Sequence, residues 1–379
     1  MPKRRLKANK DNLDDFWRFG EGLIESGVFL TDLYRFFTNN ENKGNENKNV
    51  NAPKTHPIVI DEESRKKIYE FANQKNGDQY TVYEQLPKMV APYIAGNEML
   101  KLSLCYSLAS SPDKPVHLLM IGNPASVKSD MLSEAQNIFP SAVLGGPRST
   151  EAGLTINSTN GSPGLLLRAN KGIALIDEFD KIQKSEINST YEALENGKIA
   201  VNTGKFKGEY PTKFVAIAAA NPKDGKFANI PDKIRRQIVA VIPPPLLSRF
   251  HLIFILKQES REETEDAITQ ILTRKEKSNP NWKFLHNYFN YIKNQAGRVE
   301  YDFEKGDPLV EEMSRFVVDA LEQSENEKIC YSLTKRFAEG LKRISISSAR
   351  LRLSNRVEEI DIKNAMHILK ASLDTAQNY

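Results

Sequence analysis

The sequence is poor in cysteine and contains no long apolar run without charged residues. Only two of its 379 residues are cysteines, Cys105 and Cys330, and they lie far apart in the chain. This number excludes a four-cysteine zinc site and is typical of proteins from a reducing compartment. The missing apolar run argues against a transmembrane helix, and no apolar segment of the secretory type follows the basic residues 1–16. We therefore expect no zinc and no membrane association.

The composition is that of a soluble globular chain. Hydrophobic residues make up 40% of it and charged residues 27%, both within the ordinary range. The formal net charge of +4 is mild, so it permits a nucleic-acid partner without arguing for one. A length of 379 residues predicts two or three domains.

A phosphate-binding loop is the central candidate motif. In VHLLMIGNPASVKSDML (116–132), an apolar run meets a turn that begins at Gly122 and ends at Lys128-Ser129, before a helix-compatible segment. This order directs backbone N–H groups and a helix N-terminus at phosphates, while the lysine adds charge and the hydroxyl holds Mg²⁺. The spacing fits G-x-x-x-x-G-K-[ST], but Val127 replaces the second glycine. Taken alone, a surface loop ending in Lys-Ser is an equal alternative.

A second apolar segment, GIALIDE at 172–178, supports the interpretation as a nucleotide site. A buried strand that ends in Asp177-Glu178 places one carboxylate beside Mg²⁺ and the next where it can activate water. Together the two motifs favour a P-loop ATPase over a chance pairing of short patterns.

The chain divides into four regions. Residues 1–38 carry apolar residues at helical spacing and predict a small helical region, either a cap on another surface or a docking, oligomerisation or DNA-contacting element. Residues 39–57 are rich in Asn and Lys and predict a flexible linker. Residues 58–257 combine helical and strand patterns, which predicts an α/β core. Residues 258–379 show helical spacing only.

Element boundaries follow from the periodicity and the turn residues. We expect strands near 116–121, 142–144, 172–176, 213–220 and 251–256, a hairpin at 198–207, and helices within 58–110, 185–197, 261–275, 280–295, 308–324, 332–352 and 359–377.

In this order the motifs resemble those of the MCM (minichromosome maintenance) replicative helicases, a branch of the AAA+ ATPases. The segments that carry the resemblance are GNPASVKS, AGLT, GIALIDEFDKI, AAANP, PPPLLSRFHLIFIL and TKRFAEGLKRIS. The resemblance runs from about residue 60 to the end. It implies a P-loop AAA+ core, with a parallel sheet flanked by helices, and a C-terminal helical lid. We expect the ATPase module only, because the family's N-terminal oligonucleotide-binding and zinc domain has no counterpart here.

The resemblance implies roles at an ATP site. Lys128 would bind the β- and γ-phosphates, Glu178 would polarise the attacking water, and Asn221 would be the sensor 1 residue. Arg249, as arginine finger, and Arg336, as sensor 2, would serve the site of a neighbouring subunit. Mg²⁺ would be held by Ser129 and Asp177, and ATP would be contacted by Ile94, Ala95, Gly122, Asn123, Pro124, Ala125, Ser126 and Val127. Where family members commonly have Gly-Thr-Ala, this chain has Ala125-Ser126-Val127, which predicts hydrolysis at a reduced rate.

The resemblance also implies two hairpins that contact DNA. The presensor hairpin maps to 198–207, where Thr203 stands at the position of the usual tip lysine and Lys205 and Lys207 follow it. The helix-2 insert maps to about 157–170, is short, and has Arg168 near it. Such contacts would reach phosphates and be independent of base sequence. The alternative is that both hairpins are only structural.

We therefore expect an ATP-driven DNA motor, an MCM-like helicase that hydrolyses ATP at subunit interfaces to translocate on DNA. Its partners would be DNA, further copies in a homo-oligomeric ring with a hexamer as the candidate size, and a full-length MCM protein. Its location would be cytoplasmic, at the nucleoid of an archaeal-type cell. One alternative is an ATP-binding MCM paralogue that assembles without unwinding DNA. Another is a MoxR- or chelatase-like AAA+ remodeller.

Overall fold

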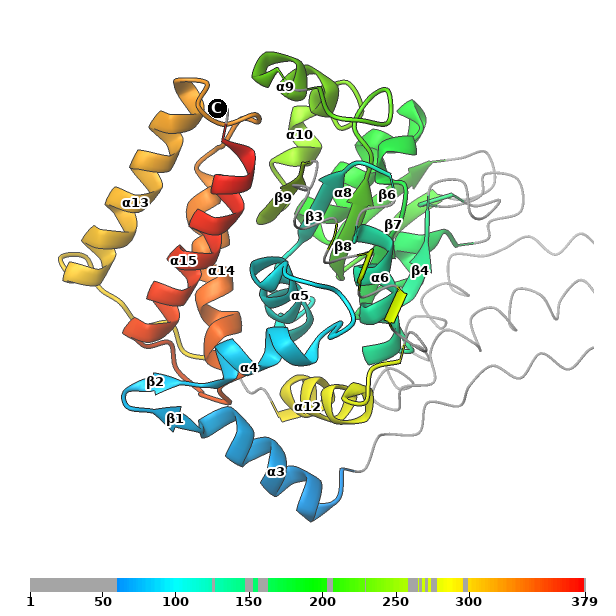
Figure 1. Ribbon diagram of the computed structural model, residues 1–379. Coiled ribbons are helices and arrows are strands. Elements are labelled where there is room, and N and C mark those ends of the chain that lie inside the picture. Colours follow the sequence, from blue (N-terminus) through cyan, green and yellow to red (C-terminus); the bar gives the residue numbers. More distant parts are fainter. Residues whose placement is uncertain are drawn as a thin grey trace, which may run out of the picture. The chain divides into compact units, whose positions relative to one another are not determined.

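The computed structural model describes most of the chain from residue 60 onward (Figure 1). The described residues are 60–124, 127–146, 153–155, 163–202, 207–228, 230–257, 265, 268–269, 272–273, 278–295 and 299–377. The contacts of residues 62–379 form one compact unit. The predictions for residues 1–38 and 39–57 lie outside the described part, as does most of the helix expected at 261–275.

A five-stranded parallel sheet lies at the centre of this unit, with the strand order β4-β5-β8-β3-β9. Its strands are β3 (Leu118–Gly122), β4 (Val143–Gly145), β5 (Ile173–Ile176), β8 (Val215–Ala220) and β9 (Leu252–Leu256). Every residue of β3, β5 and β8 is buried. Continuous apolar strands of this kind are typical of a parallel sheet covered on both faces by helices. The α/β core predicted from the sequence is confirmed.

Helices surround the sheet. In the first part of the unit they are α3 (Glu62–Asn73), α4 (Val82–Met89), α5 (Glu98–Ala109), α6 (Lys128–Ile138), α7 (Leu165–Arg168), α8 (Ile187–Asn196), α9 (Pro231–Val239) and α10 (Pro244–Leu247), with the short 3-10 helices η1 (Phe179–Lys181) and η2 (Lys184–Glu186). Helix α5 is buried on all sides from Leu100 to Ala109, because its mostly apolar sequence offers no polar face to solvent.

The region expected to be helical, residues 58–110, also contains a small antiparallel hairpin. Its strands are β1 (Lys75–Asn76) and β2 (Gln79–Tyr80). Gly77 lies in the turn with a φ of 60°, a conformation that glycine adopts without steric cost. The purely helical prediction is therefore wrong at this point, although Gly77-Asp78, the two residues between the strands, is a recognised hairpin signal.

The hairpin predicted at 198–207 is present as β6 (Lys198–Asn202) and β7 (Lys207–Pro211), which pair antiparallel. Ile199 and Val201 are buried on β6 while the alternating residues Lys198, Ala200 and Asn202 are exposed, so the strand covers the core with one face only. Gly197, with a φ of 62°, ends α8 in the left-handed conformation and turns the chain into the hairpin.

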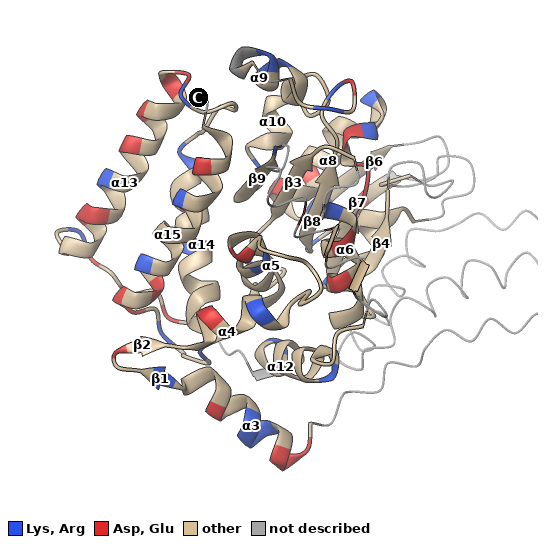
Figure 2. Ribbon diagram, viewed as in Figure 1, with Lys and Arg blue, Asp and Glu red and all other residues tan. Residues whose placement is uncertain are grey.

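The C-terminal region is helical, as predicted. Its helices are α12 (Trp282–Gln295), α13 (Pro308–Glu325), α14 (Arg336–Leu351) and α15 (Glu359–Ala376). Helix α13 carries five acidic residues and one basic residue (Figure 2). None of the described helices has the length and the apolar character needed to cross a membrane.

Helix α15 covers the edge strand β9. Ser372 Oγ accepts a hydrogen bond from Ile253 N (3.1 Å) and donates one to Ile253 O (2.7 Å). Thr375 Oγ1 accepts a hydrogen bond from Ile255 N at 3.0 Å. Two hydroxyls thus take the place of a further strand and satisfy backbone groups that an open sheet edge would leave unpaired.

Candidate functional site

The predicted phosphate loop has the expected strand, loop and helix geometry. Strand β3 ends at Gly122 and α6 begins at Lys128. The Lys128 side chain turns back into the loop, where Nζ donates hydrogen bonds to Gly122 O (2.9 Å) and Asn123 O (2.7 Å). Lys128 is only 4% exposed. The lysine therefore lies within the loop, at the helix N-terminus where an anion would bind.

Val127 does not require the backbone freedom of the glycine that it replaces. Its φ of −58° and ψ of −3° lie in the right-handed helical region, which every L-residue adopts. The departure from the motif at this position therefore causes no backbone strain. Pro124 is exposed, while Ala125 and Ser126 lie outside the described residues.

Three predicted site residues leave neighbouring strands at the same edge of the sheet. Gly122, Asp177 and Asn221 end or follow β3, β5 and β8, and β8 lies between the other two. Ile121 pairs with Ala220, and Ile176 pairs with Ala218. Gly122 is therefore level with Asn221, and Asp177 lies two residues short of Asn221, on strands about 4.8 Å apart. The family resemblance implied that these residues serve one site, and the parallel sheet brings them to the same ends of its strands.

The Lys128 ammonium is desolvated and faces two carboxylates. Burial lowers its pKa to about 8, and the negative charges of Asp177 and Asp180 offset part of that effect. A loop lysine with acidic neighbours is the charge arrangement expected of a site for a metal-bound polyphosphate. The Ser129 hydroxyl, in the first turn of α6, and the Asp177 carboxylate are the oxygen ligands that suit Mg²⁺.

Glu178 adopts a conformation that is unusual for its residue type. Its φ of 51° and ψ of 39° are left-handed, and its backbone N donates a hydrogen bond to Asp177 Oδ1 at 2.8 Å. Such conformations cost about 1 to 3 kcal/mol and cluster at functional sites. The turn leaves Glu178 exposed beside Asp177 at the sheet edge.

Asp180 belongs to the site, although the sequence analysis did not single it out. Its side chain is 1% exposed and pairs with Lys181 Nζ at 2.8 Å. Its Oδ1 accepts a hydrogen bond from Asn221 N at 2.8 Å, so it ties the end of β8 to the turn after β5. The available signal was the third acid in IDEFD (176–180).

The turn that carries the predicted ATP contacts Ile94 and Ala95 packs on the phosphate-loop helix α6 through a buried carboxylate. Glu134 of α6 accepts hydrogen bonds from Ala91 N (2.9 Å), Tyr93 Oη (3.0 Å) and Trp282 Nε1 (2.9 Å). Ile94 and Ala95 follow in the same turn, and their carbonyls accept hydrogen bonds from the side chains of Lys101 and Asn97. Helix α12 thus contributes Trp282 to the same network.

Asn123 has a structural partner. Its Oδ1 accepts a hydrogen bond from Phe227 N at 2.8 Å, which anchors the loop after β8 to the phosphate loop. Its side-chain oxygen is therefore engaged within the protein.

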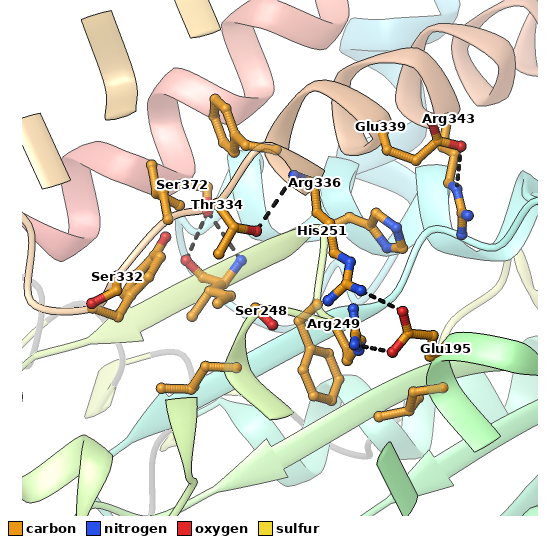
Figure 3. Close-up of a pocket in the computed structure, with 17 residues that line it drawn as sticks. Glu195, Ser248, Arg249, His251, Ser332, Thr334, Arg336, Glu339, Arg343 and Ser372 are labelled. Carbon is orange, nitrogen blue, oxygen red and sulfur yellow. Dashed lines mark hydrogen bonds and ion pairs between the residues drawn. The ribbon is translucent and has the colours of Figure 1, made fainter. Parts of the chain in front are cut away.

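The two predicted arginines converge on one carboxylate (Figure 3). Glu195, in the last turn of α8, binds Arg249 through Oε2 and Arg336 through Oε1. The Arg249 guanidinium also lies over the Tyr191 ring, 4.1 Å from its centre. Glu195, Arg249 and Arg336 line a pocket of about 180 Å³. Ser248, Thr334 and Arg343 also border it. No local pattern in the sequence pointed to Glu195.

This arginine pocket and the phosphate loop lie at opposite ends of the strands of the sheet: the pocket at the ends where the strands begin, and the loop at the ends where they finish. Arg249 precedes β9, and two residues later His251 N donates a hydrogen bond to the carbonyl of His117, just before β3 (3.0 Å). Gly122 pairs with Leu256 at the other ends of these strands. The five residues of β3, at about 3.3 Å each, separate the edges by roughly 16 Å. An arginine side chain is much shorter than this.

Two neutral histidines hold the strands together at the end of the sheet where Arg249 lies. His117 Nδ1 accepts a hydrogen bond from Ala216 N (3.0 Å), and His251 Nδ1 accepts one from His117 N (2.9 Å). Burial, with a smaller effect of Arg343, lowers the pKa of His117 to about 3. Burial together with His117 lowers the pKa of His251 as well. Both rings therefore stay uncharged, and β3, β8 and β9 are held together where Arg249 enters the pocket.

The predicted DNA-contacting residues are described only in part. Arg168 is exposed at the end of α7. Lys207 begins β7, while Thr203 and Lys205 lie outside the described residues. At the base of the hairpin, Lys198 Nζ pairs with Glu209 Oε2 at 2.7 Å, with both side chains more than half exposed.

Comparisons with known proteins agree with this geometry. The MCM P-loop domain model matches residues 65–276, and the MCM AAA-lid domain model matches residues 283–373. The minichromosome maintenance protein MCM of Saccharolobus solfataricus is 29% identical over 345 residues, which cover 84% of this chain and 48% of that protein. The zygotic DNA replication licensing factor mcm6-B of Xenopus laevis is 27% identical over 331 residues, covering 81% of this chain and 39% of that protein. The DNA replication licensing factor MCM4 of Oryza sativa subsp. japonica is 24% identical over 361 residues, with coverage of 86% and 40%. The chain thus spans less than half the length of these relatives.

Proposed function

The chain belongs to the minichromosome maintenance (MCM) family of AAA+ ATPases, and on this basis we propose that it is an ATP-driven DNA motor. In this proposal it hydrolyses ATP at the interfaces between subunits of a ring and uses the energy to translocate on DNA. The division into a core, at 58–257, and a helical lid, at 258–379, belongs to the same proposal. The two family models, which meet between residues 276 and 283, support such a division.

One observation carries the proposal of an inter-subunit site. The phosphate loop and the two arginines lie at opposite edges of one sheet, so a single chain offers two half-sites that face away from each other. A nucleotide that needs both halves must lie between two copies, with Lys128 from one and Arg249 and Arg336 from the next. Copies related in this head-to-tail way form a ring when the rotation between them closes.

The residues of the composite site would divide the chemistry as follows. Lys128 binds the β- and γ-phosphates of ATP, and Asn221 positions the γ-phosphate or the water. Glu178 accepts the proton of the attacking water, since it is exposed at the sheet edge beside Asp177. Mg²⁺, held by Ser129 and Asp177, neutralises charge on the phosphates when bound. Arg249 and Arg336 of the next subunit stabilise the charge that develops on the transferred phosphoryl group.

The β6–β7 hairpin is the proposed contact to DNA, through Thr203, Lys205 and Lys207, with Arg168 as a second contact. Helix α13 is unsuited to this task because of its acidic surface, which repels phosphates. Loss of Lys205 and Lys207 together should weaken binding to all DNA sequences. Because each lysine neutralises about one phosphate, the slope of log K against log salt should decrease by about two.

The direct test is steady-state ATP hydrolysis with and without DNA. Wild-type protein should hydrolyse ATP faster when DNA is added, and Lys128→Ala or Glu178→Gln should abolish the activity. Lys114→Ala, which changes an exposed lysine outside the site, is the matched control and should behave as wild type. Wild-type activity no higher than that of Lys128→Ala would refute the proposed enzyme.

A strand-displacement assay separates the motor from its alternatives. Unwinding that depends on Lys128 supports the helicase. ATP hydrolysis without unwinding, both alone and with a full-length MCM protein, supports a regulatory or assembly subunit. Absence of DNA binding at low salt supports the remodeller, because phosphate contacts should be strongest there.

A further inference from the structure

Glu195 holds both interface arginines at the same time. One of its carboxylate oxygens binds Arg249 and the other binds Arg336 (Figure 3). These arginines come from distant segments, the turn before β9 and the start of α14. A single carboxylate therefore fixes the separation of two guanidinium groups that the rest of the chain delivers independently.

Arg249 is far more buried than Glu195 or Arg336, so its charge depends on Glu195 as a counter-ion. The Arg249 side chain is only 3% exposed, whereas those of Glu195 and Arg336 are 27% and 46% exposed. Arg249 Nε is buried without a hydrogen-bond partner within the described part of the chain. A buried guanidinium group is costly unless an opposite charge accompanies it. Glu195 is that counter-ion, and the Tyr191 ring supports the same group from its face.

We propose that Glu195 is a positioning residue that holds Arg249 and Arg336 as one preformed unit for the γ-phosphate bound by the adjacent subunit. This inference rests on the proposed function and assigns Glu195 a task within it. In this proposal the half-exposed Arg336 contacts the γ-phosphate first, and the buried Arg249 is already held in a fixed orientation by Glu195. Groups that are already oriented lose little entropy when the transition state forms. Their positive charge therefore lowers the activation free energy more than that of mobile groups would.

The test uses two variants that are each inactive alone. Lys128→Ala protein keeps the arginine pocket and serves as the arginine donor. Arg249→Ala protein keeps the phosphate loop and serves as the loop donor. Mixed together, they should regain ATPase activity, because some interfaces then combine an intact loop with intact arginines. This first mixture tests the inter-subunit site by itself.

Glu195→Gln is then added to one donor at a time. On the arginine donor it should lower the restored kcat by about 10- to 100-fold, the range found when a residue that orients a metal ligand is removed. The KM for ATP should stay within about twofold, because the loop that binds ATP comes from the other protein. On the loop donor the same substitution should change kcat by less than about twofold. Glu195→Asp on the arginine donor, which keeps the charge but is too short to bridge both groups, should give an intermediate kcat.

Glu192→Gln is the matched control. Glu192 lies on the same helix, and its carboxylate accepts a hydrogen bond from Ala200 N at 3.4 Å. It should leave the restored activity unchanged on either donor. Thermal unfolding of each protein checks that the variants are folded. If Glu195→Gln does not fold, Glu195→Asp is used for the test instead.

The outcomes distinguish this inference from the function on which it rests. Equal loss on both donors would mean that Glu195 supports the fold of α8, and no loss on either would mean that it has no role; both overturn the inference while leaving the ATPase intact. If the first mixture regains no activity, the inter-subunit site is refuted, and the role of Glu195 with it.

Discussion

The lowered pKa of Lys128 predicts that ATP binding takes up a proton in mildly alkaline solution. In the protein without nucleotide, burial lowers this pKa from 10.5 to about 8. Phosphate oxygens beside the ammonium would raise the pKa again, because opposite charge favours the charged form. Below about pH 7, Lys128 is charged in both states and binding is independent of this group. As the pH rises through 8, Lys128 loses its proton in the free protein, and ATP binding then requires that the lysine be protonated again.

The size of the effect follows from the titration curve. About half of the Lys128 side chains are charged at pH 8 and about one tenth at pH 9. Binding should therefore take up about 0.5 proton at pH 8 and about 0.9 at pH 9. Affinity should fall by about fivefold between pH 8 and 9 and by nearly tenfold for each further pH unit, until the pH reaches the raised pKa of the complex.

Isothermal titration calorimetry measures this uptake directly when the binding enthalpy is compared in buffers of different ionisation enthalpy. Lys128→Arg is the control, since a guanidinium stays charged throughout this range and should show no uptake at pH 8 to 9. Equal proton uptake by Lys128→Arg and wild type would assign the titration to another group. No uptake by wild type at pH 9 would refute the reasoning.

The same pKa has a consequence for stability. Because the folded pKa lies below that of the unfolded chain, the charged lysine destabilises the fold at pH values below 8, and the penalty disappears between pH 8 and 10.5. At 1.36 kcal/mol for each pH unit, the interval from 10.5 to about 8 corresponds to roughly 3 kcal/mol as an upper value. Lys128→Met should therefore raise the melting temperature at pH 7 while it abolishes ATP hydrolysis, the trade-off expected where function requires a destabilising group.

Three further predictions concern the residues around the site. Asp180→Ala removes a charged hydrogen-bond acceptor from Asn221 N and should destabilise the protein by about 1.5 to 3 kcal/mol; it should also lower kcat more than KM, and equal kcat values would contradict the link to Asn221. Val127→Gly should leave ATP affinity within about twofold, because Val127 already has a helical backbone; it should lower the free energy of unfolding by up to about 1 kcal/mol, and a large gain in ATPase rate would show that crowding by valine was limiting. Ser372→Ala removes both hydrogen bonds to β9 and should cost about 1 to 3 kcal/mol in chemical denaturation, whereas Ser133→Ala, at an exposed helix position, should cost much less.

Local patterns and the family resemblance together identified the residues proposed for the nucleotide half of the site. One continuous apolar strand ends in a phosphate-loop motif, and another ends in two acids. Parallel strands have their carboxyl ends on the same side of the sheet, so the two motifs are expected to lie close together. Gly122, Lys128, Asp177 and Asn221 meet there as expected. The missed hairpin at residues 75–80 was also predictable from the sequence, since Gly77-Asp78 is a local turn signal.

The arginine half illustrates the limit of such patterns. The sequence, through its motifs, identified Arg249 and Arg336 as candidates and determined the α/β core and the helical C-terminal region, because these depend on short-range periodicity. Their place at the edge opposite to Lys128 depends on the strand order and register of the sheet. Their meeting at Glu195 depends on how α8, α14 and the turn before β9 pack. Contacts between segments this far apart are decided only when the core closes, since no local periodicity encodes which side chains then face one another.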